Sequence, residues 1–231
     1  MQTPMPITTA VFDAYGTLFD VAGAARLAAE APDGAALRQV WPHLAAEWRR
    51  KQLEYSWLRA ITGDHAPFDD VTADSLDWAM AAQGLDDPAL RARLLALYDH
   101  LPAYPEVPAT LRALHTKGIT CAILSNGTPA MLRTATTTAG IADAFAAVLS
   151  VETVGVYKPH RAVYAMVETA LGVAPSQVAF VSSNGWDIAG AAGFGFRTAW
   201  INRAGVPVDR LPHRPTTVLP DLSEVPPWIA A

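Results

Sequence analysis

Cysteine is almost absent from this sequence, since Cys121 is the only one among 231 residues. A single cysteine excludes an internal disulfide framework and a cysteine-rich zinc module. It stands inside the apolar run 119–124, so we expect a buried and inert thiol. The six histidines show no close pairing of the kind that binds zinc. We therefore expect no metal site.

Charge is also scarce, at 17% of residues, and the net charge of −5 is acidic. This balance gives no positive field to hold nucleic acid or an anionic membrane, so we expect neither partner. No apolar run approaches the roughly 20 residues of a membrane helix. Residues 1–6, MQTPMP, lack the basic start and apolar stretch of a signal peptide. We therefore expect a soluble, cytoplasmic protein.

Hydrophobic residues, in contrast, make up 51% of the chain, which is enough for a large core. They gather in short β-branched runs, each followed by polar residues: 7–12, 119–124, 146–149, 178–181 and 198–201. Helical patterns at 108–117, 129–139 and 161–171 lie between the later runs and stop at glycines. This alternation predicts an α/β fold, in which helices cover both faces of a parallel sheet.

One stretch, residues 22–102, breaks the alternation because it has no strand-like run. Its aromatic residues and leucines follow long helical patterns, and two further helical stretches are expected at 72–83 and 88–101. We interpret 22–102 as a helical cap inserted into a core that is made of residues 1–21 and 103–231.

Asp13 stands at the end of the first predicted strand, where an aspartate usually caps a helix or closes a turn. The residues expected near Asp13 favour a catalytic role for it instead. Seven other polar residues fall at or just beyond predicted strand ends: Thr17, Ser125, Asn126, Lys158, Ser182, Asn184 and Asp187. Ligand sites in parallel sheets lie beyond these carboxyl ends. A lysine facing Asp13, such as Lys158, would favour an ionised and nucleophilic carboxylate.

Four motifs resemble, in this order, those of the haloacid dehalogenase superfamily. They are FDAYGTLFDV at 12–21, ILSNG at 123–127, YKP at 157–159 and FVSSNGWD at 180–187. The resemblance covers nearly the whole chain. It implies a Rossmann-like core with a helical cap, in agreement with the pattern of strands and helices.

Most members of that superfamily are Mg²⁺-dependent phosphatases or phosphotransferases. Phosphatases of this type have a second aspartate two residues after the nucleophile and a further metal-binding carboxylate in the fourth motif. Tyr15 and Ser183 occupy these positions here, which removes an acid and a metal ligand. These substitutions, and the cap sequence WRRKQLEYSWLR at 48–59, match the L-2-haloacid dehalogenase subfamily. The alternatives are a Mg²⁺-dependent small-molecule phosphatase and a catalytically idle anion-binding protein.

The resemblance implies hydrolysis of short (S)-2-haloacids to (R)-2-hydroxy acids and halide, with inversion and without a cofactor. Asp13 would attack C2 of the substrate and form an ester intermediate, while Thr17 orients its carboxylate. Arg49 from the cap would receive the departing halide, together with Asn126 and Phe68.

Further residues complete the site that the resemblance implies. Ser125 would hold the substrate carboxylate. Asp187 would activate the water that hydrolyses the ester, supported by Ser182, Asn184 and Lys158. Apolar residues would surround the alkyl group, and Tyr164 would support the site; the apolar set is Tyr15, Leu53, Phe68 and Trp186. The implied partners are the 2-haloacid, the halide product and, in a homodimer, a second copy of the chain.

Overall fold

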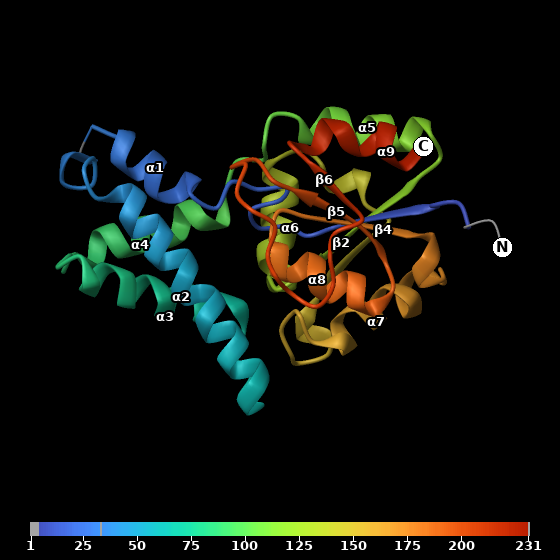
Figure 1. Ribbon diagram of the computed structural model, residues 1–231. Coiled ribbons are helices and arrows are strands. Elements are labelled where there is room, and N and C mark those ends of the chain that lie inside the picture. Colours follow the sequence, from blue (N-terminus) through green and yellow to red (C-terminus); the bar gives the residue numbers. More distant parts are fainter. Residues whose placement is uncertain (1–4, 33, 231) are drawn as a thin grey trace.

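The computed structural model describes residues 5–32 and 34–230. Figure 1 shows two parts, a group of helices on one side and a sheet covered by helices on the other. Residues 1–4, which carry part of our expectation about a signal peptide, lie outside the described residues. No helix among the described residues is both long and apolar enough to cross a lipid bilayer.

The sheet has six strands in the order β3-β2-β1-β4-β5-β6, and every neighbouring pair is parallel. The strands are β1 (Thr9–Phe12), β2 (Thr120–Ser125), β3 (Ala147–Ser150), β4 (Val178–Ser182), β5 (Arg197–Ile201) and β6 (Thr217–Leu219). The first five lie where the apolar runs predict them. The sequence does not predict β6, because three half-exposed residues at a sheet edge give no clear apolar run. β1 is central and fully buried, as a strand covered on both faces must be.

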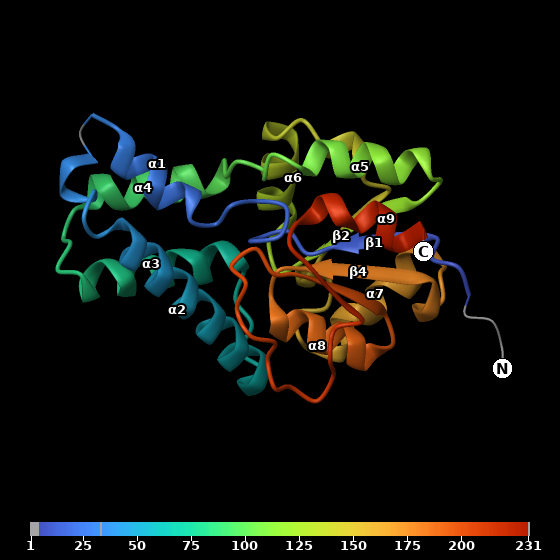
Figure 2. The same ribbon diagram turned by 45° about the horizontal axis from the view of Figure 1, so that its top comes forward.

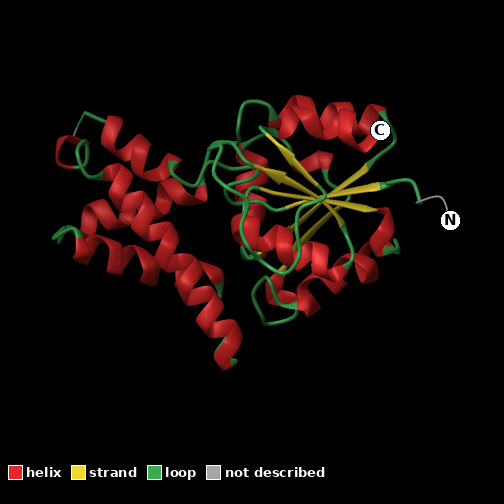
Figure 3. Cartoon of the chain, viewed as in Figure 1, coloured by secondary structure: helices red, strands yellow, loops and turns green. Residues whose placement is uncertain are grey.

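Helices cover both faces of the sheet, as the alternation of strands and helices predicts (Figures 1 and 3). α5 (Val107–Thr116) and α9 (Val225–Ala230) lie on one face, and α7 (Arg161–Leu171) and α8 (Gly185–Phe194) lie on the other. α6 (Pro129–Thr138) packs beside β3 and contacts α4. The α/β fold class is therefore confirmed.

The helical group consists of α1 (Gly23–Glu30), α2 (Trp41–Thr62), α3 (Phe68–Ala82) and α4 (Pro88–Asp99). α4 begins where Asp87 accepts hydrogen bonds from the backbone N–H groups of Ala89 and Leu90, at 2.9 and 3.0 Å. α3 begins about one turn before the expected position of residue 72. Asp69 and Asp70 explain the early start, because acidic side chains in a first turn stabilise the helix dipole.

Two linkers join the helical group to the sheet, and their backbones are hydrogen-bonded to each other. Asp20 N–H donates to the carbonyl of Pro102 at 3.0 Å, and Tyr104 N–H donates to the carbonyl of Leu18 at 2.9 Å. Together they tie the helical group to the carboxyl edge of the sheet; in Figure 2 the arrow of β4 points toward it.

Candidate active site

The polar residues that follow the strands meet around Asp13 at the carboxyl edge of the sheet. β1 lies between β2 and β4, so the residues that end those two strands flank Asp13 on either side. The Asp13 backbone N–H donates to the carbonyl of Val181 at 2.9 Å, which continues the β1–β4 pairing by one residue. Asp13 is only 6% exposed. A carboxylate buried to this extent requires hydrogen-bond partners.

Asp13 has such partners on both of its carboxylate oxygens. Oδ2 accepts three hydrogen bonds, from Thr17 Oγ1 at 2.9 Å, Asn184 Nδ2 at 2.8 Å and Ser182 Oγ at 3.3 Å. Oδ1 accepts one, from Lys158 Nζ at 3.1 Å. The two oxygens therefore differ, since three neutral donors surround one and a single ammonium group contacts the other.

Lys158 also connects Asp13 to a second buried carboxylate. Its Nζ lies 2.8 Å from Asp187 Oδ2, while Tyr164 Oη donates to Asp187 Oδ1 at 2.7 Å. Burial would lower the pKa of Lys158, but the charges of Asp13 and Asp187 outweigh it and raise that pKa above its ordinary value. The ammonium form is therefore the one present at neutral pH.

Burial also determines the pKa of Asp187. The side chains of Asp187 and of its partners Lys158 and Tyr164 are all fully buried. Burial raises the pKa of Asp187 to about 6, although the Lys158 ammonium opposes the change; the Asp13 charge adds to it. A carboxyl group with this pKa is ionised at neutral pH and is a stronger base than an ordinary aspartate.

Arg49 reaches the site from α2 in the helical group. Its Nη2 donates to Asn184 Oδ1 and to the backbone carbonyl of Tyr15, both at 3.3 Å. Asn184 in turn donates to Asp13, so a single amide connects the Arg49 guanidinium to the carboxylate. The structure therefore brings Arg49 to the strand-end residues although 36 positions separate it from Asp13.

A buried polar network behind Arg49 was not predicted from the sequence. Arg49 Nη1 donates to Gln52 Oε1 at 2.7 Å, and Gln52 Nε2 donates to Thr72 Oγ1 at 2.7 Å and to Tyr98 Oη at 3.1 Å. Gln52 is 1% exposed. Gln52 follows Arg49 by three positions and therefore lies on the same helix face, which could have indicated this contact. The helical pattern was assigned from apolar residues, so it does not identify the glutamine.

Aromatic rings form one side of the site. Tyr15 is buried and stacks on Tyr98 with ring centroids 5.5 Å apart. Phe68, at the start of α3, packs between Tyr15 and Tyr157 with both centroid distances at 5.9 Å. Burial raises the pKa of Tyr15 well above its ordinary value, so its hydroxyl stays neutral.

Leu53 and Trp186 are only half-buried. Leu53 lies four residues after Arg49 on α2, and therefore on the same face of the helix. Trp186 is in the first turn of α8, and its ring meets that of Trp57 edge to face at 5.5 Å. The contact of Trp186 with Trp57 therefore lies between the helical group and the sheet.

Ser125 ends β2, Asn126 follows it directly, and both are buried. Ser125 Oγ accepts the Gly127 N–H at 3.1 Å, and Asn126 Oδ1 accepts the backbone N–H of Lys158 at 3.0 Å. The second bond fixes the amide of Asn126, so its Nδ2 is the group left to donate elsewhere. Asn126 thus lies beside Lys158, and Ser125 precedes it at the end of β2.

Ser183 occupies the position where the resemblance places a metal-binding carboxylate in phosphatases. Its hydroxyl donates to the carbonyl of Gly16 at 2.7 Å, and its N–H donates to Thr17 Oγ1 at 2.8 Å. Ser183 therefore holds the loop after β1 in place.

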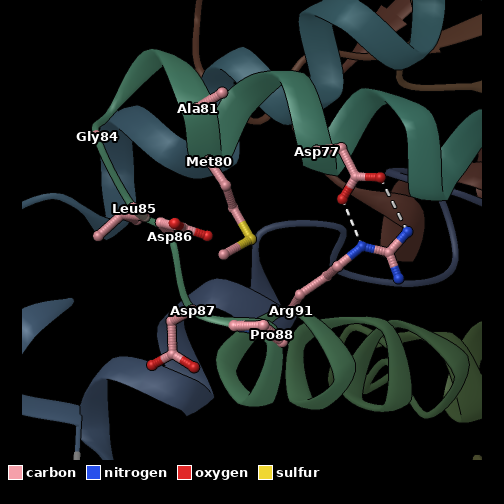
Figure 4. A pocket seen from close by; sticks show the side chains of 9 residues that line it. All are labelled: Asp77, Met80, Ala81, Gly84, Leu85, Asp86, Asp87, Pro88 and Arg91. Carbon is pink, nitrogen blue, oxygen red and sulfur yellow. Dashed lines mark hydrogen bonds and ion pairs between the residues drawn. The ribbon is translucent and has the colours of Figure 1, made fainter.

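A separate hollow of about 390 Å³ lies at the junction of α3 and α4 (Figure 4). Its lining includes Met80, Leu85 and Pro88, and the ion pair of Asp77 with Arg91 closes one side. None of the residues that line it belongs to the group around Asp13.

The comparisons with known proteins agree with this geometry. The family model of haloacid dehalogenase-like hydrolases matches residues 7–195. The chain belongs to this family. The match begins just before β1 and ends just after α8, so it includes every residue that we describe around Asp13.

Individual relatives within this family are similar to the chain over nearly its whole length. The (S)-2-haloacid dehalogenase 1 of Pseudomonas sp. (strain CBS-3) is 43% identical over 222 residues, which cover 96% of each chain. A solved L-2-haloacid dehalogenase from Xanthobacter autotrophicus, with chloropropionic acid covalently bound, superposes with a TM-score of 0.86 at 36% identity, covering 97% of this chain and 99% of that one. A haloacetate dehalogenase of Moraxella sp. (strain B) is 36% identical, covering 95% of this chain and 96% of that protein.

These relatives do not favour the phosphatase alternative that the sequence leaves open. All three are named as dehalogenases rather than phosphatases. The site agrees, because the position of the phosphatase acid carries the buried ring of Tyr15.

Proposed function

We propose that this protein is an (S)-2-haloacid dehalogenase that hydrolyses short 2-haloalkanoates through an ester on Asp13. The observation that carries the proposal is the buried Asp13 carboxylate, bonded to Lys158 and fixed by three neutral donors, with Arg49 beside it. An ionised carboxylate held in a fixed orientation is suited to in-line displacement at carbon. Halide leaves as an anion, so the reaction needs no acid at Tyr15.

The hydrogen bonds of Asp13 suggest which oxygen attacks. Three donors reduce the reactivity of Oδ2, whereas Oδ1 contacts only Lys158. We assign Oδ1 as the nucleophile: it forms a bond to C2 as the carbon–halogen bond breaks, and the halide takes the electron pair. Oδ2 then becomes the carbonyl oxygen of the ester.

The same donors serve the second step. Water attacks the carbonyl carbon of the ester and negative charge develops on Oδ2, where Thr17, Ser182 and Asn184 donate hydrogen bonds. Donors that are already in place stabilise such an oxyanion without reorganisation. Asp187 accepts one proton of the water as the tetrahedral intermediate forms. The bond between the carbonyl carbon and Oδ1 then breaks, the departing alkoxide takes the second proton of the water and becomes the 2-hydroxy acid, and Asp13 is left as a carboxylate that carries the water oxygen. The net reaction consumes one water and releases one halide and one proton.

Arg49 provides the halide site in this proposal, together with Asn126 and Phe68. Its guanidinium is already oriented by Gln52 and Asn184, so it meets a leaving anion with several N–H donors. Ser125, with nearby backbone N–H groups, takes the substrate carboxylate. Tyr15, Leu53, Phe68 and Trp186 surround the alkyl group, and Tyr164 fixes Asp187.

The proposal is tested by halide release from (S)- and (R)-2-chloropropionate in EDTA, with p-nitrophenyl phosphate and Mg²⁺ in a parallel assay. We expect halide from the (S) isomer alone and no phosphate release. Asp13→Ala should lower halide release by at least about 10³-fold. Asp86→Asn is the control. Asp86 is an exposed carboxylate beside the hollow of Figure 4, so its replacement should leave the rate of halide release unchanged. Phosphate release without halide would overturn the proposal.

A single turnover with excess enzyme in oxygen-18 water tests the ester directly. The first turnover should place the label in Asp13 and leave the product unlabelled, because the product oxygen comes from the carboxylate. Labelled product with unlabelled Asp13 would make Asp13 a general base and refute the ester.

We also propose that residues 22–102 act as a cap over a core formed by residues 1–21 and 103–231. Arg49, Leu53 and Phe68 support this division, since the helical group supplies one wall of the site and the sheet supplies the nucleophile.

A cytoplasmic location and a homodimer complete the proposal. The lone buried Cys121 suits a reducing compartment, and exposed apolar side chains at Leu58 and Ile61 of α2 suit a contact between copies. Cell fractionation and sedimentation equilibrium test these two points.

A further inference from the structure

Arg203 lies in the chain between β5 and β6 and reaches the loop that follows β1. Its Nη2 donates to the carbonyl of Thr17 at 3.1 Å, and its Nη1 donates to the carbonyl of Gly16 at 3.4 Å. Figures 1 and 2 show this stretch running along the side of the core that is nearest to the helical group. One side chain far along the sequence thus binds two consecutive carbonyls beside the nucleophile.

The same guanidinium also binds the second linker between the helical group and the sheet. Nη2 donates to Glu106 Oε1 at 2.7 Å, and the guanidinium carbon lies 3.8 Å from the ring centroid of Tyr104. Asp20, in the first linker, pairs instead with Arg26 at 2.7 Å. Arg203 therefore joins the loop after β1 to the second linker through four separate contacts.

The loop that Arg203 binds controls the orientation of Asp13. Thr17 Oγ1 donates to Asp13 Oδ2 at 2.9 Å and accepts the Ser183 N–H at 2.8 Å. Gly16 has a φ of +89°, a left-handed conformation that side-chain-bearing residues rarely adopt. The loop therefore has an unusual shape, and external donors on its carbonyls help to keep that shape.

The contacts of Arg203 go beyond a single ion pair. The Arg203 and Glu106 side chains are 23% and 21% exposed, and the same guanidinium also binds two loop carbonyls and the Tyr104 ring. The planar guanidinium of Arg203 contacts two carbonyls, a carboxylate and a ring at the same time, and the ammonium group of a lysine cannot reproduce this arrangement.

We propose that Arg203 is a positioning residue, which couples the placement of the second linker to the orientation of Thr17 and hence of Asp13. It touches neither substrate nor reacting atoms and acts through the loop of residues 14–18. The inference rests on the proposed function only in its kinetic part.

The kinetic test compares Arg203→Ala, Arg203→Lys and the control Arg197→Ala, which removes an arginine 5.7 Å from the Trp228 ring. We expect both Arg203 variants to lower kcat by about 10-fold to 100-fold, since small misplacements of a reacting group have effects of this size. KM should change less than about threefold, and millimolar guanidinium chloride should restore part of the kcat of Arg203→Ala. Arg197→Ala should keep the kcat of the unaltered protein. An unchanged kcat in the Arg203 variants, or a rise in KM alone, would overturn the proposal.

Hydrogen–deuterium exchange tests the same proposal without an assay of activity. The amides of Gly16 and Leu18 are hydrogen-bonded within the loop, to the carbonyls of Phe19 and Ala14 at 2.8 Å. Arg203→Lys should accelerate their exchange, while Arg197→Ala should not. Exchange that is unchanged at 14–20 refutes the positioning role. If the unaltered protein releases no halide, the proposed function fails, and the exchange result still decides the role of Arg203.

Discussion

At the scale of single residues, the proposed mechanism gives the two oxygens of the Asp13 carboxylate different chemical tasks, and the donors around them differ accordingly. Oδ1 contacts one ammonium group, and Oδ2 contacts three neutral donors. The sequence places all of these residues after strands and thereby predicts that they converge. It does not say which oxygen each donor meets, because that depends on side-chain directions across separate strands and loops.

Asp187 provides a prediction about pH at this scale. Its pKa is raised to about 6, chiefly by burial, so the base form is lost as the pH falls through 6. Burial, the main cause, persists in the ester, whereas the Asp13 charge that adds to the rise is absent there. Hydrolysis of the ester should therefore slow only as the pH falls below about 6, and it should stay constant from about pH 7 upward because the pKa of Lys158 is raised above its ordinary value. Rapid-quench measurements of ester decay between pH 5 and 9 check this.

Asp187→Asn should separate the two chemical steps. Without the base we expect kcat to fall by about 10²-fold to 10⁴-fold, and the ester on Asp13 to accumulate. Intact-protein mass spectrometry would detect it as an added propionate group after reaction with (S)-2-chloropropionate. A variant that loses the formation of the ester rather than its decay would contradict the assignment of Asp187 as the base.

At the scale of elements, helix α8 shows how close packing supports the site. A Cβ added at Gly190 would lie 2.4 Å from Tyr164 Oη and 2.8 Å from Pro159 Cβ, which is too close. Gly190 therefore allows Tyr164 to approach α8 and donate to Asp187. The sequence shows the glycine but does not show which side chain packs against it, because Tyr164 belongs to a different helix, α7.

Gly190→Ala should destabilise the fold by about 1–3 kcal/mol and lower kcat, because Tyr164 must move away from Asp187. Gly193→Ala is the matched control on the same helix. A Cβ there meets the ring of His213 at 2.6 Å, but that side chain is exposed and free to move. We expect the control to change stability by less than about 1 kcal/mol. Thermal unfolding and initial rates measure both effects; equal losses in the two variants would argue against the packing of Tyr164 as the cause.

At the scale of the whole molecule, contacts between the helical group and the sheet complete the site. Besides Arg49, Tyr157 Oη donates to the carbonyl of Ala66 at 2.5 Å, and His65 Nε2 lies 3.0 Å from Glu152 Oε2. Both contacts hold the short loop that leads into Phe68. The position of Phe68 therefore depends on residues of the core that follow β3.

Tyr157→Phe should weaken this attachment and raise KM several-fold with a smaller effect on kcat, because Phe68 loses its fixed position. Removing one hydrogen bond should lower the free energy of unfolding by about 1 kcal/mol. Tyr55→Phe is the control, since Tyr55 lies within α2, where its ring faces Lys51 at 5.5 Å. Steady-state kinetics and denaturant titration distinguish the two. An unchanged KM in Tyr157→Phe would show that the loop does not depend on this bond.

The sequence by itself determined the alternation of strands and helices, the inserted helical stretch and the residues that meet at the carboxyl edge. These features follow from local patterning and from the geometry of parallel sheets, in which strand ends share one edge. The tertiary structure alone decided the network of Gln52, Thr72 and Tyr98, the short strand β6 and the reach of Arg203 to the loop after β1. These contacts join segments far apart in the chain, and their partners are set by how whole elements pack rather than by any local pattern.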